Sequence, residues 1–269
     1  MALLEGKTGL VVGIANDRSY AFHIAKALTE HGATCGYTHL PGEKNERRTR
    51  KAVESMGQTG DEADGWYRPL DASSDEELDK VFEDYAKDFG RMDFLVHSIA
   101  FADREWLQPG KFTATPREAY LSAIDISAYT LAAMANRARE LMASPEEGKP
   151  GGSIMCMSYY GAEKVVPGYN VMGVAKASLE CTARYLAAEL GEQGIRVNSI
   201  SGGYLRTLAS SAVAGTDVFS DHSEQRSPLR RNVEGSDVGG TAVWLASDLS
   251  AGVTGETIYV DCGVNTIGL

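Results

Sequence analysis

Short apolar segments alternate with longer amphipathic segments along the whole chain of 269 residues, and this alternation constrains the fold more than any other feature. Strands that are separated by helices pair in parallel, because each helix carries the chain back to the start of the next strand. We therefore expect one α/β domain over residues 1–269, with a doubly wound, seven-stranded parallel sheet and helices on both faces. The expected strands are 8–12, 33–38, 65–70, 92–97, 153–158, 195–200 and 257–261.

Helical segments and one long irregular segment connect these strands. In a doubly wound sheet, ligands bind beyond the carboxyl ends of the strands, here expected at strands 8–12 and 92–97. The segment of residues 201–227 is rich in small residues and shows no clear periodicity. Because such a segment in a compact domain is usually a lid or a binding loop, we expect it to bind the substrate. The expected helices are 21–30, 76–89, 116–142, 169–190 and 235–246.

Charge and cysteine content argue against several classes of protein. Lys and Arg total 26 and Asp and Glu total 37, so the net charge is −11. This balance argues against binding to nucleic acid and to anionic membranes. The four cysteines form no Cys-x-x-Cys pair, so we expect buried, reduced thiols and no disulfide or metal site. They are Cys35, Cys156, Cys181 and Cys262.

Hydropathy along the chain bears on the cellular location. No apolar run approaches the roughly 20 residues that a membrane-spanning helix needs. The first ten residues lack a basic region before an apolar core, so we expect no signal peptide. A cytoplasmic protein is the expectation.

Tyr169 and Lys176 are the strongest candidates for chemistry. They lie seven positions apart in the helical pattern 169–190, which is just short of two helical turns, so both side chains are expected on one helix face. A phenol donates a proton or a hydrogen bond, and an ammonium binds sugar hydroxyls. Beside a nucleotide site, this pair is suited to hydride transfer. The alternatives are a packed aromatic patch that includes Tyr159 and a surface lysine.

The loop after the first strand is a candidate nucleotide site. It lacks the full Gly-x-Gly-x-x-Gly pattern and keeps Gly13, with Ser19 and Ala21 at the later small-residue positions. Small residues let the backbone approach a pyrophosphate at a helix N-terminus, where free N–H groups and the helix dipole favour anions. An ordinary tight turn explains a single glycine equally well.

The segments that would meet the adenosine leave the choice between NAD and NADP open. The second strand ends without a carboxylate that could bind a ribose hydroxyl. The basic run 47–51 is suited to a 2′-phosphate, but a charged run is more often a solvated helix face. Asp71, after the third strand, can bind an adenine amine or cap the next helix. His97 is expected to be a core histidine at a strand end.

The chain resembles the short-chain dehydrogenase/reductase superfamily and, within it, the enoyl-acyl-carrier-protein reductases of bacterial fatty-acid synthesis. The Tyr169-x6-Lys176 spacing is the most specific part of the resemblance. Commoner members of the superfamily use Tyr-x3-Lys, which needs a tyrosine where this chain has Met172, so a reductase of ketones or alcohols is the runner-up. The other matching segments are Gly13 with Ser19, 97–102 (HSIAFA), 125–127 (DIS), 158–163 (SYYGAE), 169–180 (YNVMGVAKASLE), 206–209 (RTLA), 227–231 (SPLRR) and 247–252 (SDLSAG).

The resemblance implies a Rossmann fold and the reduction of a 2,3-trans-enoyl thioester by a nicotinamide cofactor, with NADH preferred and NADPH possible. Tyr169 would hydrogen-bond the thioester oxygen, Lys176 would hold the nicotinamide ribose, and Tyr159 would support the site. Ala102, Tyr159 and Met172 would contact the substrate. The implied cofactor-binding residues are Gly13, Ser19, Tyr20, Leu40, Asp71, Ala72, Ile99, Lys176, Leu205, Arg206, Thr207, Leu208 and Ala209.

The resemblance also implies partners. The substrate would arrive on acyl carrier protein, an acidic protein, so we expect a local positive patch beside residues 201–227 that includes Arg206, Arg230 and Arg231. A homotetramer is implied, with helices 116–142 and 169–190 as interface elements. A nucleotide sensor without activity is a further alternative, but such a protein would not need both Tyr169 and Lys176. Departures from the family pattern are Leu40, Ala100, Tyr204 and Cys262.

Overall fold

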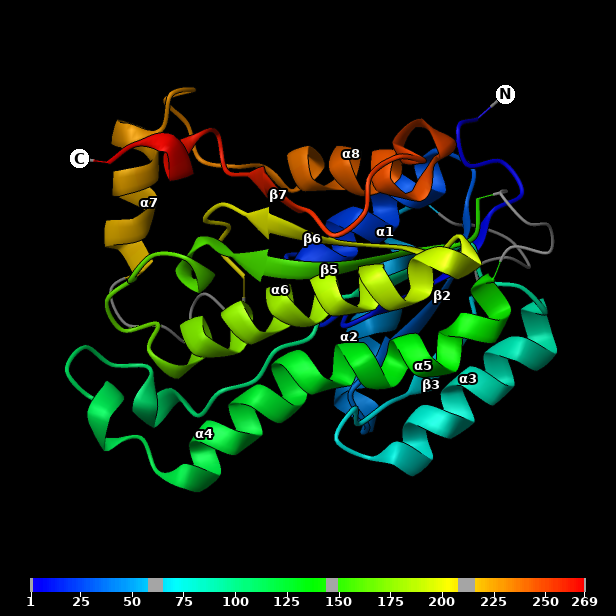
Figure 1. The fold of residues 1–269 in the computed structure, drawn as a ribbon, viewed down its shortest axis with the longest axis horizontal. Coiled ribbons are helices and arrows are strands. Elements are labelled where there is room, and N and C mark those ends of the chain that lie inside the picture. Colours follow the sequence, from blue (N-terminus) through cyan, green and yellow to red (C-terminus); the bar gives the residue numbers. More distant parts are fainter. Residues whose placement is uncertain (1, 58–64, 144–149, 208–215, 269) are drawn as a thin grey trace.

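The computed structural model describes residues 2–57, 65–143, 150–207 and 216–268, and in these residues the strands form one seven-stranded sheet (Figure 1). The strand order is β3-β2-β1-β4-β5-β6-β7, and every neighbouring pair runs parallel. The order reverses between β1 and β4, which is the switch point of a doubly wound sheet. The strands are β1 Thr8–Val12, β2 Thr34–His39, β3 Tyr67–Pro69, β4 Phe94–His97, β5 Ser153–Tyr159, β6 Arg196–Gly202 and β7 Thr257–Val260.

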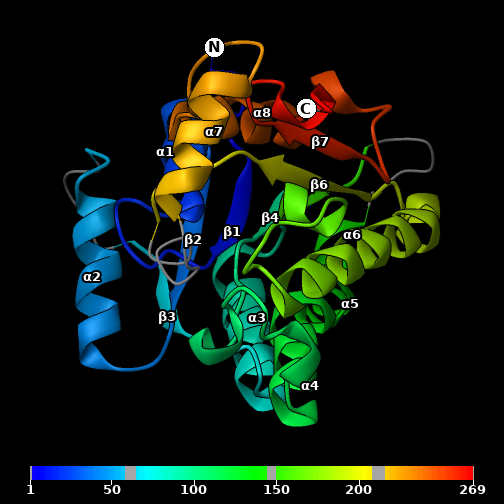
Figure 2. The same ribbon diagram turned by 90° about the vertical axis from the view of Figure 1, so that its left-hand side faces the viewer.

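Helices cover both faces of the sheet, as predicted. Figure 2 shows α1 and α8 on one side of the strands and α3, α5 and α6 on the other. The helices are α1 Tyr20–Glu30, α2 Glu43–Glu54, α3 Asp75–Phe89, α4 Arg117–Ile124, α5 Thr130–Met142, α6 Val171–Leu190, α7 Thr216–Arg226 and α8 Gly235–Ala246. The predicted Rossmann architecture is therefore confirmed.

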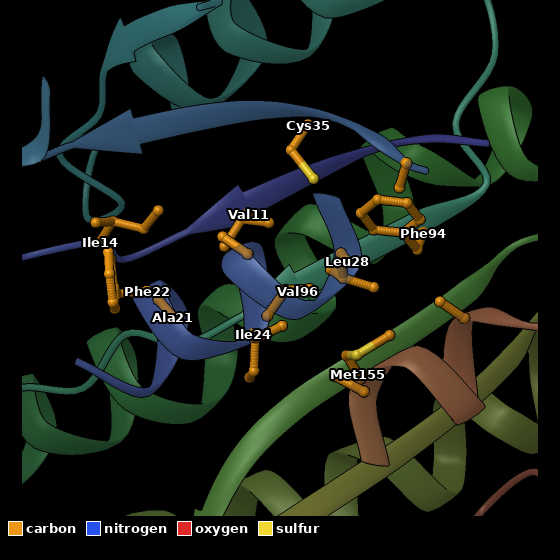
Figure 3. Close-up of a cluster of buried hydrophobic side chains, with 14 of the residues drawn as sticks. Val11, Ile14, Ala21, Phe22, Ile24, Leu28, Cys35, Phe94, Val96 and Met155 are labelled. Carbon is orange, nitrogen blue, oxygen red and sulfur yellow. The ribbon is translucent and has the colours of Figure 1, made fainter. Parts of the chain in front are cut away.

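Alternation along each strand divides the core into two layers. Val11 of β1 packs with α1 and α8 (Figure 3), whereas its neighbours Leu10 and Val12 pack with α3, α5 and α6. The same division separates Val96 of β4 from Leu95. Successive strand residues point to opposite faces, so a strand that is covered on both sides must be apolar at every position. This is the origin of the uninterrupted apolar segments in the sequence.

The predicted helix 116–142 contains an interruption. The segment Asp125–Tyr129 forms a π-helical turn between α4 and α5. In this turn Ser127 Oγ accepts a hydrogen bond from Phe101 N (3.0 Å) and donates one to Phe101 O (3.2 Å). The π turn therefore ties the helix to the loop that follows β4, at the carboxyl edge of the sheet, and such turns are common at functional sites.

Most predicted strand boundaries differ from the structure by one or two residues, and two differences elsewhere bear on the site. Helix α6 begins at Val171 and not at residue 169, so the Tyr169 side chain lies outside the helix. The segment predicted as a loop over residues 201–227 contains helix α7. The sequence of α7 carries few apolar residues, so a helical period was not visible in it.

The cysteines follow the prediction in part. Cys35 and Cys156 are buried and all four thiols are free, but Cys181 is exposed and Cys262 is half-buried. The prediction of burial was wrong for these two, because Cys181 lies on the outer side of α6 and Cys262 lies in a turn with φ +58° after β7. Across the described ranges, no helix is both long and apolar enough to cross a membrane.

Candidate active site

A cavity of about 920 Å³ lies along the carboxyl edge of the sheet. It runs from the ends of β2 and β3, past the turn after β1, to the first two turns of α6. Most of the predicted site residues border it, although they come from seven separate segments of the chain. These residues are Gly13, Ser19, Tyr20, Leu40, Asp71, Ala72, Ile99, Ala102, Tyr159, Tyr169, Met172, Lys176, Leu205 and Thr207.

Gly13 closes the turn between β1 and α1. Its φ angle is +106°, and a Cβ atom there would lie 2.3 Å from Ser98 O, so a side chain has neither a favourable conformation nor space. Ser19 caps α1, with its Oγ accepting a hydrogen bond from Phe22 N at 3.2 Å. The first turn of α1 carries no acidic residue, so its positive end remains available to an anion. This segment is thus a tight turn that leads into a helix N-terminus with no acidic side chain in its first turn.

Tyr20, the first residue of α1, also borders the cavity. Its hydroxyl donates to Gly203 O, and its ring lies so close to Gly202 that a Cβ atom there would be 2.8 Å from Tyr20 Cζ. Burial raises the pKa of Tyr20 well above its ordinary value. Tyr20 therefore fixes the end of β6 to α1 with its polar group already bonded, and the residue borders the cavity.

One end of the cavity lies between β2 and α2. Leu40 is largely exposed there, and Asp71 Oδ1 accepts hydrogen bonds from Ser73 N (3.0 Å) and Ser73 Oγ (2.6 Å). Ser74, and not Asp71, caps α3. Asp71 therefore orders the turn after β3 and borders the cavity without capping a helix.

The basic run of α2 separates into two groups. Arg48 borders the cavity, whereas Arg47, Arg50 and Lys51 line the outer side of the helix. Arg50 is paired with Glu46 at 2.9 Å. The run is thus mainly a solvated face, with Arg48 as the residue that borders the cavity.

Lys176 lies at the centre of the site on α6. Only 6% of the residue is exposed, and its Nζ donates to Met157 O at 2.7 Å. Burial lowers the pKa of Lys176 to about 8. Next to it, His97 is fully buried and its Nε2 bonds Thr130 Oγ1 at 2.8 Å. The sequence-based interpretation of His97 as a core histidine is therefore confirmed.

Tyr169 reaches the site from the turn before α6. The predicted arrangement of Tyr169 and Lys176 on one helix face was wrong, because Asn170 has φ +46° and breaks the helix between them. Asn170 Nδ2 donates to Trp106 O and to Gln108 O, both at 2.7 Å, and so anchors this turn to the loop after β4. Asparagine is the non-glycine residue that adopts positive φ most readily, so the Tyr-Asn pair was the available signal for this turn.

Two tyrosine rings meet above the cavity. The rings of Tyr159 and Tyr169 pack edge to face with centroids 5.0 Å apart. Burial raises the pKa of both phenols, that of Tyr159 to about 12 and that of Tyr169 further. Gly161 makes room for them, since a Cβ atom there would lie 2.5 Å from Tyr169 Cδ1. Both phenols are therefore neutral at pH 7 and able to donate a hydrogen bond.

An apolar cluster forms the wall beside Tyr169. Met172 is buried with Leu107, Ala123, Val171 and Ala175, and Ala102 packs against the same cluster. The wall suits an acyl chain better than a polar group, because a polar group buried against it would lose its hydrogen bonds to water.

Some predicted residues lie elsewhere. Arg206 is exposed and does not border the cavity, while Leu208 and Ala209 fall outside the described residues. Arg231 is paired with Asp237 through two bonds of 2.6 and 3.0 Å, so its charge is already balanced, and Arg230 donates to Gln225 O. The described residues contain no group of three or more metal-ligating side chains.

Comparisons with known proteins agree on one family. The family model described as enoyl-(acyl carrier protein) reductase matches residues 13–265. The NADH enoyl-acyl-carrier-protein reductase FabI of Synechocystis sp. is 46% identical over 268 residues, which cover 99% of both chains. The NADPH enzyme of Staphylococcus aureus is 46% identical over 267 residues, which cover 99% of this chain and 100% of that one. The crystal structure of the Bacillus cereus reductase with NADP⁺ and an indole naphthyridinone has a TM-score of 0.92 at 43% identity, with 100% of both chains covered.

Proposed function

The chain belongs to the enoyl-acyl-carrier-protein reductase family, and we propose that Tyr169, Lys176 and Tyr159 carry out the reaction in the cavity described above. The enzyme is an NADH-dependent oxidoreductase that reduces the trans-2,3 double bond of enoyl thioesters on acyl carrier protein, the last step of the fatty acid elongation cycle. The observation that carries the assignment of residues is that a neutral phenol, Tyr169, and a buried lysine, Lys176, border the same cavity.

The residues that border the cavity fit a dinucleotide. The turn at Gly13 and the first turn of α1 would receive the pyrophosphate, since no acidic side chain opposes an anion in that turn. Asp71, Ala72 and Leu40 would border the adenosine at the β2–β3 end. Leu205 and Thr207 would lie against the nicotinamide at the other end, together with Lys176. When bound, the reduced nicotinamide supplies a hydride to carbon 3 of the substrate.

The residues of this chain would stabilise the charge that develops on the substrate. As carbon 3 becomes saturated, negative charge builds up on the thioester oxygen as an enolate, and a donor aimed at that oxygen lowers the barrier. Tyr169 is that donor, because its phenol is protonated at pH 7 without a proton having to be supplied. Carbon 2 takes a proton afterwards. Lys176 orients the cofactor through its ribose hydroxyls, and the wall around Met172 keeps water from the acyl chain.

A ketone or alcohol reductase is the alternative within the superfamily. Its tyrosine would stand at residue 172, where this chain has a methionine that is 7% exposed and packed among apolar side chains. Two tyrosines belong to α6 and the turn before it, Tyr169 and Tyr185. Tyr169 borders the cavity, whereas Tyr185 is 76% exposed and does not. The enoyl reductase therefore agrees better with the position of the phenol.

Acyl carrier protein, which would deliver the substrate, is expected to contact a positive patch beside residues 201–227. Asp237 already balances the charge of Arg231, and Arg206 is exposed, so we propose that Arg206 is the main cation that contacts the acidic carrier protein. Arg206→Glu is expected to raise the KM for carrier-bound substrate and to leave the KM for a small enoyl thioester unchanged. An unchanged KM for carrier-bound substrate, or a rise by the same factor for both substrates, would contradict the assignment. From the family resemblance we further propose a homotetramer and a cytoplasmic location.

The test of the function is the oxidation of NADH, followed by absorbance, with a trans-2-enoyl thioester as substrate. We expect turnover by the wild type and a loss of about 10²-fold or more in kcat for Tyr169→Phe, as for the removal of one oxyanion donor. Tyr185→Phe makes the same chemical change at an exposed position of α6 and is the matched control. The absence of turnover with either NADH or NADPH, in folded wild-type protein, would contradict the function.

A further inference from the structure

Two consecutive residues at the end of β5 are bonded to two residues one turn apart on α6. Lys176 Nζ donates to Met157 O at 2.7 Å, and Ser158 Oγ donates to Glu180 Oε1 at 2.5 Å. The next residue of β5 is Tyr159, whose ring packs against that of Tyr169. The side chains of Lys176 and Glu180 thus hold the segment that carries one catalytic tyrosine.

In the Ser158–Glu180 bond the hydroxyl donates and the carboxyl oxygen accepts, which is the role that an ionised carboxylate takes. Glu180 is half-buried, and burial raises the pKa of its carboxyl group. The hydrogen bond from Ser158 and the positive charges of Arg184 and Lys176 lower this pKa, whereas the negative charge of Glu163 raises it. Glu163 is itself occupied by Tyr259 Oη (2.5 Å) and Lys164 Nζ (2.9 Å).

The surroundings of Lys176 leave Glu180 as its principal counter-charge. Residues four apart on a helix are neighbours, with about 5–6 Å between their Cβ atoms. From β5, the Cys156 thiol faces Lys176, but burial raises its pKa to about 11, so it is neutral at pH 7. From β4, His97 faces it, and burial lowers the pKa of His97 to about 3, so it is neutral too. Burial works against the charge on Lys176, and Glu180 works in favour of it.

We propose that Glu180 is a positioning residue, whose carboxylate holds the end of β5 through Ser158 and keeps the neighbouring Lys176 protonated for the ribose hydroxyls of the cofactor. The proposal rests on the proposed function in one respect, namely that Lys176 binds the cofactor. An ammonium has three donors and the bond to Met157 uses one of them. A deprotonated Lys176 would keep that bond and lose the charge that orients the ribose.

The test is the dissociation constant of NADH from pH 6 to pH 9, measured by fluorescence titration without an enoyl substrate. In the wild type, binding should weaken as the pH rises through about 8, where Lys176 loses its proton. Glu180→Gln keeps an oxygen acceptor for Ser158 and removes the charge, so the midpoint should fall by about one pH unit. At pH 7.5 this shift weakens NADH binding by about threefold, while at pH 6 both proteins should bind almost equally.

Three control variants separate charge from structure. Glu189→Gln makes the same change at an exposed position near the end of α6, and the midpoint should stay at the wild-type pH. Ser158→Ala removes the hydrogen bond and leaves the carboxylate, so kcat should fall while the midpoint stays. Lys176→Arg carries a charge that persists above pH 12, so the fall in binding around pH 8 should disappear.

A midpoint of Glu180→Gln that coincides with the wild type would overturn the proposal, as would an equal shift in Glu189→Gln. If circular dichroism shows that Glu180→Gln is unfolded, Glu180→Asp carries the test. Aspartate keeps the charge, so the midpoint must stay at the wild-type pH, and a fall of a full unit would refute the proposal. The binding test needs no thioester, so the two claims can fail separately. If NADH binding shows the predicted pH dependence but the protein does not reduce enoyl thioesters, only the proposed function is refuted.

Discussion

Gly161→Ala tests the position of the Tyr169 ring more sharply than any change at the ring itself. The new methyl group would lie 2.5 Å from Tyr169 Cδ1, 2.8 Å from Tyr169 Cε1 and 3.3 Å from Tyr159 Cδ1. The Tyr169 ring must therefore retreat by about 1 Å to regain a normal carbon–carbon separation. A displacement of this size at a catalytic group costs about 10²-fold in rate. Overpacking should also lower the free energy of unfolding by about 1–3 kcal/mol.

The assay compares kcat with the dissociation constant of NADH. We expect kcat to fall by about two orders of magnitude, while NADH binds within about twofold of the wild type, because Gly161 is not among the residues that border the cavity. Gly240→Ala is the matched control, since a Cβ atom inside α8 meets nothing within 4 Å. It should leave kcat unchanged and raise the free energy of unfolding by about 0.5–1 kcal/mol. A variant Gly161→Ala with wild-type kcat would refute the assignment of Tyr169 as donor in this position.

Three further outcomes are expected. His97 has its pKa lowered by burial to about 3, so the unfolded chain binds a proton that the folded chain does not, and stability falls as the pH drops from about 6.5 to about 3; acid unfolding of His97→Gln should therefore lose stability less steeply over this range. Arg48→Ala should raise the dissociation constant of NADPH by about tenfold and leave that of NADH unchanged, because Arg48 borders the β2 end of the cavity, where a 2′-phosphate would lie; equal changes for both cofactors would contradict this role. Asn170→Ala should lower the free energy of unfolding by about 1–3 kcal/mol, measured by urea titration, since it loses two hydrogen bonds and forces alanine into φ +46°; Asn170→Gly, which loses the same bonds without the strain, should be less destabilised.

The sheet and, to within two residues, its strand boundaries were predictable because they depend on local apolar content. A strand that is covered on both faces must be apolar at each position, so β1 was recognisable as Thr8–Val12 to the residue. Gly13 was recognisable because the turn requires positive φ. Helix α8 was likewise predicted with its observed bounds, Gly235–Ala246.

The sequence by itself thus determined the α/β sheet, and it indicated Tyr169 and Lys176 as candidates for chemistry, both of which border the cavity at the carboxyl edge of the sheet. The tertiary structure decided how these two residues meet. The turn at Asn170 is held by the carbonyls of Trp106 and Gln108, more than 60 positions away, and no periodicity in the sequence records such partners. The same reason explains the exposed Arg206, the pairing of Arg231 with Asp237 and the bond between Ser158 and Glu180. Local propensity follows from neighbours along the chain, whereas the charge and direction of a side chain follow from the elements packed against it.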